Sequence, residues 1–158
     1  MLIVSDTTAI TNLWQVGHLN LLQQLYGQVT VPPAVWNELM ALPGQAAALQ
    51  ALGWLQVHTP QDRRMVGELL LVLDQGEAEA IALSLELGAD FLIMDEALGR
   101  KKAESLHIKV VGLLGILIKA KHEGLVMAVG PLLERLEQEA GFYISPQLYQ
   151  AVLRASNE

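Results

Sequence analysis

The chain contains no cysteine and few charged side chains. The 158-residue sequence therefore has no disulfides, no thiolate metal site and no catalytic cysteine. Charged residues make up 17% of the chain, against roughly 25% in an average soluble protein. Ten Lys and Arg residues against 17 Asp and Glu residues give a net charge of −7. This charge excludes a uniformly basic nucleic-acid-binding protein, but it is compatible with a local basic patch.

Long apolar runs are also missing. No run reaches the roughly 18 apolar residues that cross a bilayer, and the first residues lack the basic segment that begins a secretory signal. The absence of cysteine is typical of a reducing compartment. We therefore expect a cytoplasmic protein with no membrane partner. Apolar residues still make up 52% of the chain, which is enough to build a core.

Short apolar segments alternate with helical patterns along most of the sequence. Residues 2–5, 28–31, 54–58, 91–94 and 109–111 are apolar without strict alternation, which is typical of strands covered on both faces. Helical patterns follow most of these segments. The order predicts an α/β protein with a three-layer α/β/α fold and a central, mostly parallel sheet.

The last part of the chain departs from this order. Helices are predicted over about 130–140 and 147–154, with no strand between them. We predict a sheet domain over residues 1–125 and a C-terminal helical extension, residues 126–158, packed on the same domain. Residues 62–73 also have a helical pattern, and Leu70–Leu73 are apolar enough to be expected in the core.

Acidic residues stand at the ends of predicted strands. Asp6 and Glu38 are the only two charged side chains in the first 61 residues. Asp6 follows the first strand and Asp95 follows the strand at 91–94. In a parallel sheet both emerge at the carboxyl edge, where open α/β sheets bind ligands. Glu38 lies about two turns into the helix after the second strand, and Glu77 opens the helix that leads into the strand at 91–94. Both helices begin at this edge, which puts Glu38 within roughly 6–9 Å of it along the helix axis, so the four carboxylates are expected to converge.

Converging carboxylates favour a metal ion. They repel one another and raise one another's pKa values, and a hard divalent cation relieves this repulsion. Mg²⁺ and Mn²⁺ take oxygen ligands of this kind. Carboxylates with such an ion are the apparatus of phosphodiester hydrolysis, in which the metal activates a water. We predict that Asp6, Glu38, Glu77 and Asp95 are both metal ligands and catalytic residues.

Each acid also has a purely structural alternative. Asp6 and Asp95 are at positions where either could cap a helix. Glu77 would be favourable near a helix N-terminus in any case, and Glu38 could simply be solvated.

A basic stretch follows the fourth acid. Between Arg100 and Lys121 the chain has six basic residues and one acid, so the segment carries about +5 in a −7 protein. Arg100, Lys101 and Lys102 come about one helical turn after Asp95. A nucleic-acid backbone passing the metal site would need such a patch, although a solvated helix face is the alternative. With only eight aromatic residues in the chain, no base-stacking platform is predicted.

The order and spacing of several segments resemble the PIN domain, most closely its bacterial and archaeal VapC-like branch. The resemblance covers nearly the whole chain. The segments that carry it are Val4–Leu13, Val31–Glu38, Gly76–Leu83, Leu92–Glu96, Gly112–Leu117 and Gly141–Ser145.

The resemblance implies a ribonuclease that depends on Mg²⁺ or Mn²⁺, and many PIN domains are toxins silenced by a small antitoxin. Thr8 matches the small polar residue that assists the first Asp, and Asn12 matches a polar position frequent in this branch. The residues that match the family's acidic quartet are Asp6, Glu38, Glu77 and Asp95.

Two positions depart from the family pattern. The third acid is usually Asp in the toxins, whereas this chain has Glu77 in a Gly-Glu-Ala-Glu string, which makes Glu79 a rival ligand. The position after Asp95, sometimes a second acid, is Glu96. Glu79 and Glu96 are therefore candidate auxiliary ligands, with a solvent-facing role as the alternative.

These observations predict a metal-dependent endoribonuclease that hydrolyses RNA phosphodiester bonds, and the resemblance implies 5′-phosphate and 3′-hydroxyl products. It is predicted to be the toxin of a type II toxin–antitoxin pair, with RNA and a small antitoxin as partners. Low charge also favours a homodimer. The alternatives are a weak or inactive PIN-like module that binds RNA or a protein, and a phosphohydrolase with an aspartyl nucleophile. The last requires a second Asp where Thr8 stands.

Overall fold

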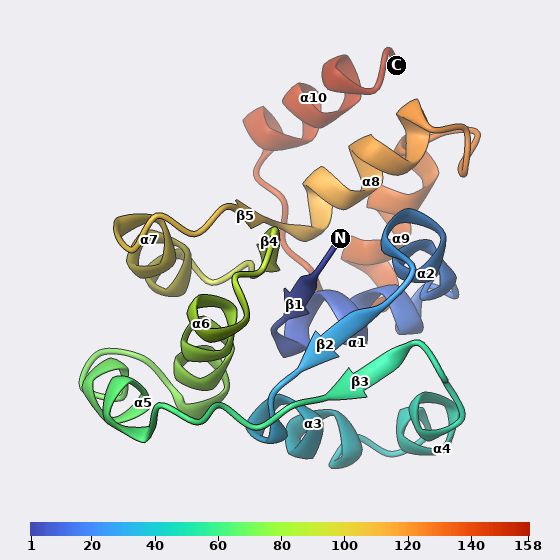
Figure 1. The fold of residues 1–158 in the computed structure, drawn as a ribbon. Coiled ribbons are helices and arrows are strands. Elements are labelled where there is room, and N and C mark those ends of the chain that lie inside the picture. Colours follow the sequence, from blue (N-terminus) through green and yellow to red (C-terminus); the bar gives the residue numbers. More distant parts are fainter.

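The computed structural model describes residues 1–158 and contains one five-stranded, fully parallel sheet (Figure 1). The strands are ordered β3-β2-β1-β4-β5 across the sheet. Their bounds are β1 Ile3–Ser5, β2 Val29–Val31, β3 Leu55–Val57, β4 Phe91–Ile93 and β5 Val110–Val111.

Ten helices surround the sheet, which confirms the predicted three-layer α/β/α fold. The first five are α1 Thr7–Gln15, α2 Asn20–Tyr26, α3 Pro33–Met40, α4 Gln45–Gln50 and α5 Arg63–Leu69. The other five are α6 Gln75–Leu87, α7 Ala97–Ser105, α8 Leu113–His122, α9 Gly130–Glu139 and α10 Pro146–Ala155. None of them combines the length and the apolar character that crossing a bilayer requires.

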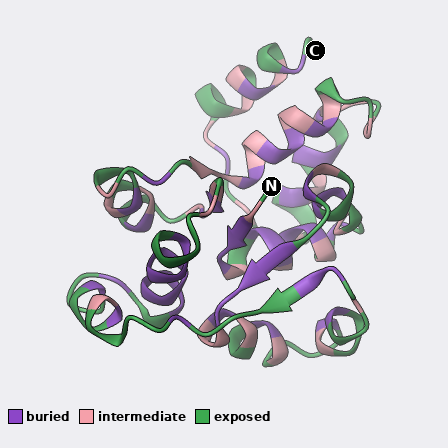
Figure 2. Ribbon diagram, in the orientation of Figure 1, coloured by how far each residue is buried: buried purple, intermediate pink, exposed green.

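Both faces of the sheet are buried. Ile3 and Ile93 belong to the larger core cluster, which packs on α1, α8 and α9. Val4 and Leu92, their neighbours along β1 and β4, belong to a smaller cluster with Ile81 of α6. Successive side chains of a strand point to opposite faces, so strands with continuous apolar sequences contribute side chains to both core clusters. The inner strands and most of α6 are accordingly buried (Figure 2).

The pairing of β1 with β4 sets the position of the site. Ile3 pairs with Phe91, Val4 with Leu92 and Ser5 with Ile93, so the two strands end at the same level. The N–H of Asp6 continues the ladder by donating to the Ile93 carbonyl at 2.9 Å. The residues that follow β1 and β4 therefore lie at the same carboxyl edge of the sheet.

The C-terminal helices share the core of the sheet. Leu133 and Leu136 of α9 and Val152 of α10 lie in the larger cluster together with strand residues. α10 packs on α8 at the periphery (Figure 1). Glu158 accepts a hydrogen bond from Val129 N at 2.7 Å and forms an ion pair with Lys121 at 3.1 Å. These contacts hold the end of the chain against the start of α9 and against α8.

The expectation that Leu70–Leu73 are all in the core is wrong. Helix α5 ends at Leu69, and a new helix begins after Asp74, so the chain must turn between them. Within this turn only Leu73 is buried, whereas Leu71 is 85% exposed and Val72 is 60% exposed. Three apolar side chains, those of Leu70, Leu71 and Val72, are thus left on the surface.

Candidate active site at the carboxyl edge of the sheet

Asp6 is a buried carboxylate that does not serve as a helix cap. It occupies the N-cap position between β1 and α1, yet its side chain makes no capping hydrogen bond. Only 8% of the residue is exposed. Burial raises the pKa of Asp6 to about 6, and repulsion by Glu38, Asp74 and Asp95 contributes to the rise. The structural alternative for Asp6, helix capping, therefore does not account for its placement.

Asp95 lies two residues beyond β4, and only one of its two carboxylate oxygens is hydrogen-bonded within the fold. Its Oδ1 accepts a hydrogen bond from Leu113 N, at the start of α8, at 3.0 Å. Its Oδ2 is buried and has no hydrogen-bond partner. Burial raises the pKa of Asp95, against the opposing effects of the Leu113 N–H and the Arg100 guanidinium. One oxygen of this carboxylate is therefore held in place and the other is free.

Glu77 has the same division of its two oxygens. It forms a capping box with Asp74 at the start of α6: Glu77 N donates to Asp74 Oδ1 at 2.8 Å, and Asp74 N donates to Glu77 Oε1 at 3.2 Å. Glu77 Oε2 is buried without a partner. Burial raises the pKa of Glu77 above its ordinary value. Glu77 thus caps its own helix and still presents one unpaired oxygen.

Glu38 is exposed and reaches the site from α3. It accepts a hydrogen bond from the Thr7 hydroxyl. Gly76 permits this placement, because a Cβ there would lie 2.6 Å from Glu38 Oε1 and 3.6 Å from Asp6 Oδ1. The glycine at the start of α6 therefore leaves room for two carboxylates from other elements.

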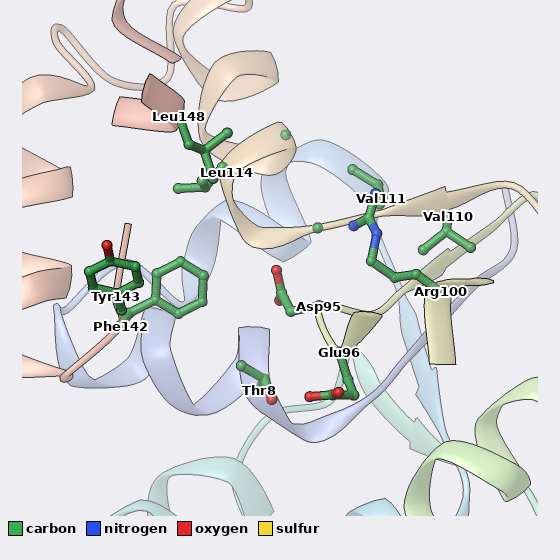
Figure 3. Close-up of a pocket in the computed structure, with 12 residues that line it drawn as sticks. Thr8, Asp95, Glu96, Arg100, Val110, Val111, Leu114, Phe142, Tyr143 and Leu148 are labelled. Atoms are coloured by element: carbon green, nitrogen blue, oxygen red, sulfur yellow. The ribbon is translucent and has the colours of Figure 1, made fainter. Parts of the chain in front are cut away.

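Two adjoining hollows contain these side chains. The smaller has a volume of about 240 Å³, and the acids that line it are Asp6, Glu38, Asp74, Glu77 and Glu96. The larger, of about 760 Å³, is lined by Asp95 and Arg100 among others. Thr8 and Glu96 line both hollows (Figure 3). Three of the four predicted acids thus share one hollow, and the fourth lies in the next.

The other candidate residues are spread more widely. Asn12 is buried on α1 and lines neither hollow. Glu79, also buried, accepts hydrogen bonds from Ala34 N and from Gln75 Nε2, both at 3.1 Å. Arg100 lines the larger hollow and donates to the Met94 carbonyl at 3.1 Å.

The remaining two basic candidates lie outside both hollows. Lys101 is exposed and Lys102 is half-buried on α7.

Asp74, which lines the acidic hollow, was not among the residues predicted from the sequence. The signal was present, since an Asp three residues before a Glu at the start of a helix is the pattern of a capping box. Phe142 and Tyr143, which line the larger hollow, were not predicted either. No local pattern places these two aromatics, because their position depends on how α9 and α10 pack.

The donor set fits a hard divalent cation. In this arrangement no three acidic or imidazole side chains come together closely enough to bind one ion. Mg²⁺, however, is usually bound through one or two carboxylates and keeps several waters. The free oxygens of Glu77 and Asp95 and the crowded Asp6 are oxygen donors that a cation would satisfy.

Comparison with known proteins agrees with this architecture. A family model described as a PIN domain matches residues 2–158, nearly the full length. No curated protein matches the chain. PIN domains are generally nucleases and typically use divalent metal ions, so the chain has a nuclease-type fold. On the strength of the full-length match and the parallel α/β/α architecture, the chain belongs to the PIN-domain family.

Proposed function

We propose that the protein is a metal-dependent endoribonuclease with its centre in the smaller hollow. The observation that carries the proposal is the set of buried carboxylates at the end of β1, the start of α6 and the end of β4. Glu77 and Asp95 each keep a buried oxygen without a partner beside Asp6. Buried polar atoms normally have a hydrogen-bond partner. Two buried carboxylate oxygens without a partner at one edge of the sheet therefore indicate a site for a ligand.

Asp6, Glu77 and Asp95 are the residues that would hold one or two ions, some of them through metal-bound waters, with Glu38 as a further ligand. Bound Mg²⁺ or Mn²⁺ would lower the pKa of a water and stabilise charge on the phosphate. The chain's contribution is orientation: the Leu113 N–H fixes Asp95, the Asp74 N–H fixes Glu77, and the Thr7 hydroxyl fixes Glu38. With these three carboxylates each fixed by one hydrogen bond, little reorganisation of them is needed when RNA binds.

Arg100 is the only basic side chain that lines either hollow. It lies in the larger hollow close enough to Asp95 to lower that carboxyl's pKa. We assign it to the phosphate next to the cleaved bond, with exposed Lys101 contacting the strand further along α7. RNA is preferred over DNA on the basis of the family alone.

We further assign the protein to the VapC-like branch, as the toxin of a toxin–antitoxin pair. Val72 and Leu98 line the acidic hollow although they are 60% and 62% exposed, and Leu71 beside them is 85% exposed. An antitoxin segment with apolar side chains and one basic residue would complement this rim and the carboxylates. Expression of the chain alone should then stop growth, and co-expression of a short neighbouring gene should restore it.

A homodimer and a cytoplasmic location complete the proposal. The low charge of the chain and its exposed apolar residues favour self-association. Light scattering after size-exclusion chromatography tests the dimer, which predicts about twice the 17.2 kDa chain mass. Fractionation of the host cells tests the location.

The test of the nuclease is cleavage of a mixed single-stranded RNA pool with Mg²⁺, Mn²⁺ or EDTA. Wild type is compared with Asp6→Asn and Asp95→Asn, and with Glu134→Gln, an exposed acid on α9, as the control. We expect cleavage with either metal by the wild type and the control, none in EDTA, and a loss of at least about 100-fold in both Asn variants. Equal cleavage by all four proteins would refute the proposed centre.

A second candidate is a non-catalytic module that binds RNA or a protein. It is favoured by the finding that no three acidic side chains converge in this arrangement. Metal binding by the folded wild type, with no cleavage in either metal, would select this candidate.

A further inference from the structure

The larger hollow has a volume and an apolar lining that metal binding by the carboxylates does not require. Its volume of about 760 Å³ lies within the range of roughly 300–1,000 Å³ of small-molecule pockets. Half of the residues that line it are apolar, and they come from β5, α8, the segment between α9 and α10, and α10 itself. A metal ion bound at the carboxylates would leave most of this space empty.

One side of the hollow is aromatic and the opposite side is cationic. Figure 3 shows Phe142 and Tyr143 on one side, Arg100 on the other, and Asp95 between them. Tyr143 is 79% exposed, although a large ring gains by burial. Aromatic rings and guanidinium planes are the groups on which unpaired bases stack. The two sides together therefore suit a flat, polar-edged ring.

The aromatic pair is held in place at both ends. Gly141, with φ +65°, ends α9 in the left-handed conformation, and Phe142 N donates to the Leu136 carbonyl at 3.0 Å. On the other side Ser145 caps α10 by accepting from Leu148 N at 3.2 Å. Three residues between two fixed helix ends have little backbone freedom, so the positions from which the two rings project are set before any ligand binds.

We propose that the larger hollow binds one unpaired nucleobase of the RNA, the base next to the phosphate at the acidic centre. The two hollows share Thr8 and Glu96, so a nucleotide with its base on Tyr143 has its sugar and phosphate beside the carboxylates. Arg100, on the opposite side of the hollow, contacts the phosphate of this nucleotide. This inference rests on the proposed function for its substrate, and it specifies single-stranded RNA with a base turned out of the stack.

The test measures RNA binding without cleavage. A labelled single-stranded RNA is titrated with the protein in low-salt buffer, with Ca²⁺ in place of Mg²⁺ because both take oxygen ligands. The same strand with abasic ribose at every position is the second probe. The proteins are wild type, Tyr143→Ala, Tyr143→Phe and Met127→Ala. Met127 is a matched control because it is 96% exposed and lines neither hollow.

We expect Tyr143→Ala to weaken binding of the normal strand about ten-fold, the scale of one base–aromatic stack. Tyr143→Phe keeps the ring and should stay within about two-fold of wild type, as should Met127→Ala. On the abasic strand Tyr143→Ala should bind as wild type does. The proposal is overturned if Tyr143→Ala has no effect, if it weakens both strands equally, or if wild type does not distinguish the strands.

The outcome separates this inference from the proposed nuclease. Cleavage in Mg²⁺ with no effect of Tyr143→Ala on binding would keep the nuclease and reject the base pocket. Base-dependent binding through Tyr143 with no cleavage in Mg²⁺ or Mn²⁺ would keep the pocket and reject the nuclease.

Discussion

The two adjoining hollows at the sheet edge are built by different means. The acidic hollow takes its carboxylates from the residue after β1, from the cap and first turn of α6, from the residue before α7 and from the second turn of α3. The parallel topology brings these positions to one edge of the sheet. The larger hollow takes its aromatic side from the connection between α9 and α10. The first is thus a property of the sheet domain, whereas the second exists only because the C-terminal helices pack on it. The acidic chemistry and the apolar pocket can then be assigned to separate parts of the chain.

The hollows also differ in their electrostatic cost. In the acidic hollow burial raises the pKa values of Asp6 and Glu77, so ionising these carboxylates in the metal-free chain costs folding free energy. In the larger hollow Arg100 partly offsets the effect of burial on Asp95. We therefore expect substitutions in the acidic hollow to change activity and stability in opposite directions.

The largest effect should separate the two glutamates of α6. Glu77 presents an unpaired oxygen, whereas both contacts of Glu79 are to the fold, at Ala34 and Gln75. Glu77→Gln should lower metal-dependent RNA cleavage by at least about 100-fold, and Glu79→Gln should stay within a few-fold because its amide oxygen can still accept from Ala34 N. Cleavage rates under single-turnover conditions decide the matter. The reverse order would make Glu79 the third acid.

Asp6→Asn should stabilise the metal-free protein. The pKa of Asp6 rises from 3.8 to about 6 on folding, so the folded state binds this proton more tightly than the unfolded state. The resulting cost is absent below about pH 4, grows as the pH rises to about 6, and is then complete at roughly 3 kcal/mol. The variant avoids this cost.

The measurement is the Tm of wild type and Asp6→Asn in EDTA across this pH range. At pH 7.5 the variant should melt roughly 5–10 °C higher, given about 2–4 °C per kcal/mol for a chain of this size. Near pH 4 the two curves should meet. A variant that melts lower than wild type at pH 7.5 would show that Asp6 is a stabilising residue and would remove the electrostatic contrast between the hollows.

Gly76→Ala should harm activity without harming stability. The added Cβ would meet Glu38 Oε1 at 2.6 Å, and this exposed carboxylate can move aside. We expect cleavage to fall about ten-fold, while alanine in the helix adds about 0.5–1 kcal/mol of stability. Gly67→Ala in α5 is the matched control because a Cβ there meets no atom within 4 Å. Equal cleavage by the two variants would mean that Glu38 does not need its observed position.

Leu71→Ser should have the smallest effect on the isolated chain. Leu71 is 85% exposed, so its loss should change the free energy of unfolding by no more than about 0.5 kcal/mol. Urea denaturation measures this change. A much larger loss would show that the turn between α5 and α6 packs in solution, as the sequence had suggested, and that it is not a free rim of the acidic hollow.

The sequence predicted the parts of the molecule that depend on local pattern and topology. The strand segments ending before Asp6 and Asp95 were found because apolar runs stop at those acids, and the parallel sheet then placed both at one edge. Leu71 was misassigned because its apolar character suggests burial, whereas the capping box of Asp74 forces a turn before it.

Tertiary packing accounts for what the sequence could not predict. Phe142 and Tyr143 form one side of a hollow only when α9 and α10 are packed against α8, and no periodicity encodes that arrangement. The split between the two oxygens of Asp95 likewise depends on the start of α8, eighteen residues further along the chain.

The most direct test of the difference between the hollows is calorimetric titration of the metal-free protein with Mn²⁺ at pH 7.5. Wild type, Asp6→Asn, Tyr143→Ala and the surface control Glu134→Gln are compared. We expect saturable Mn²⁺ binding by wild type, Tyr143→Ala and Glu134→Gln, and no binding by Asp6→Asn. Undiminished binding by Asp6→Asn, or no binding by wild type, would contradict the assignment of the acidic hollow as a metal centre.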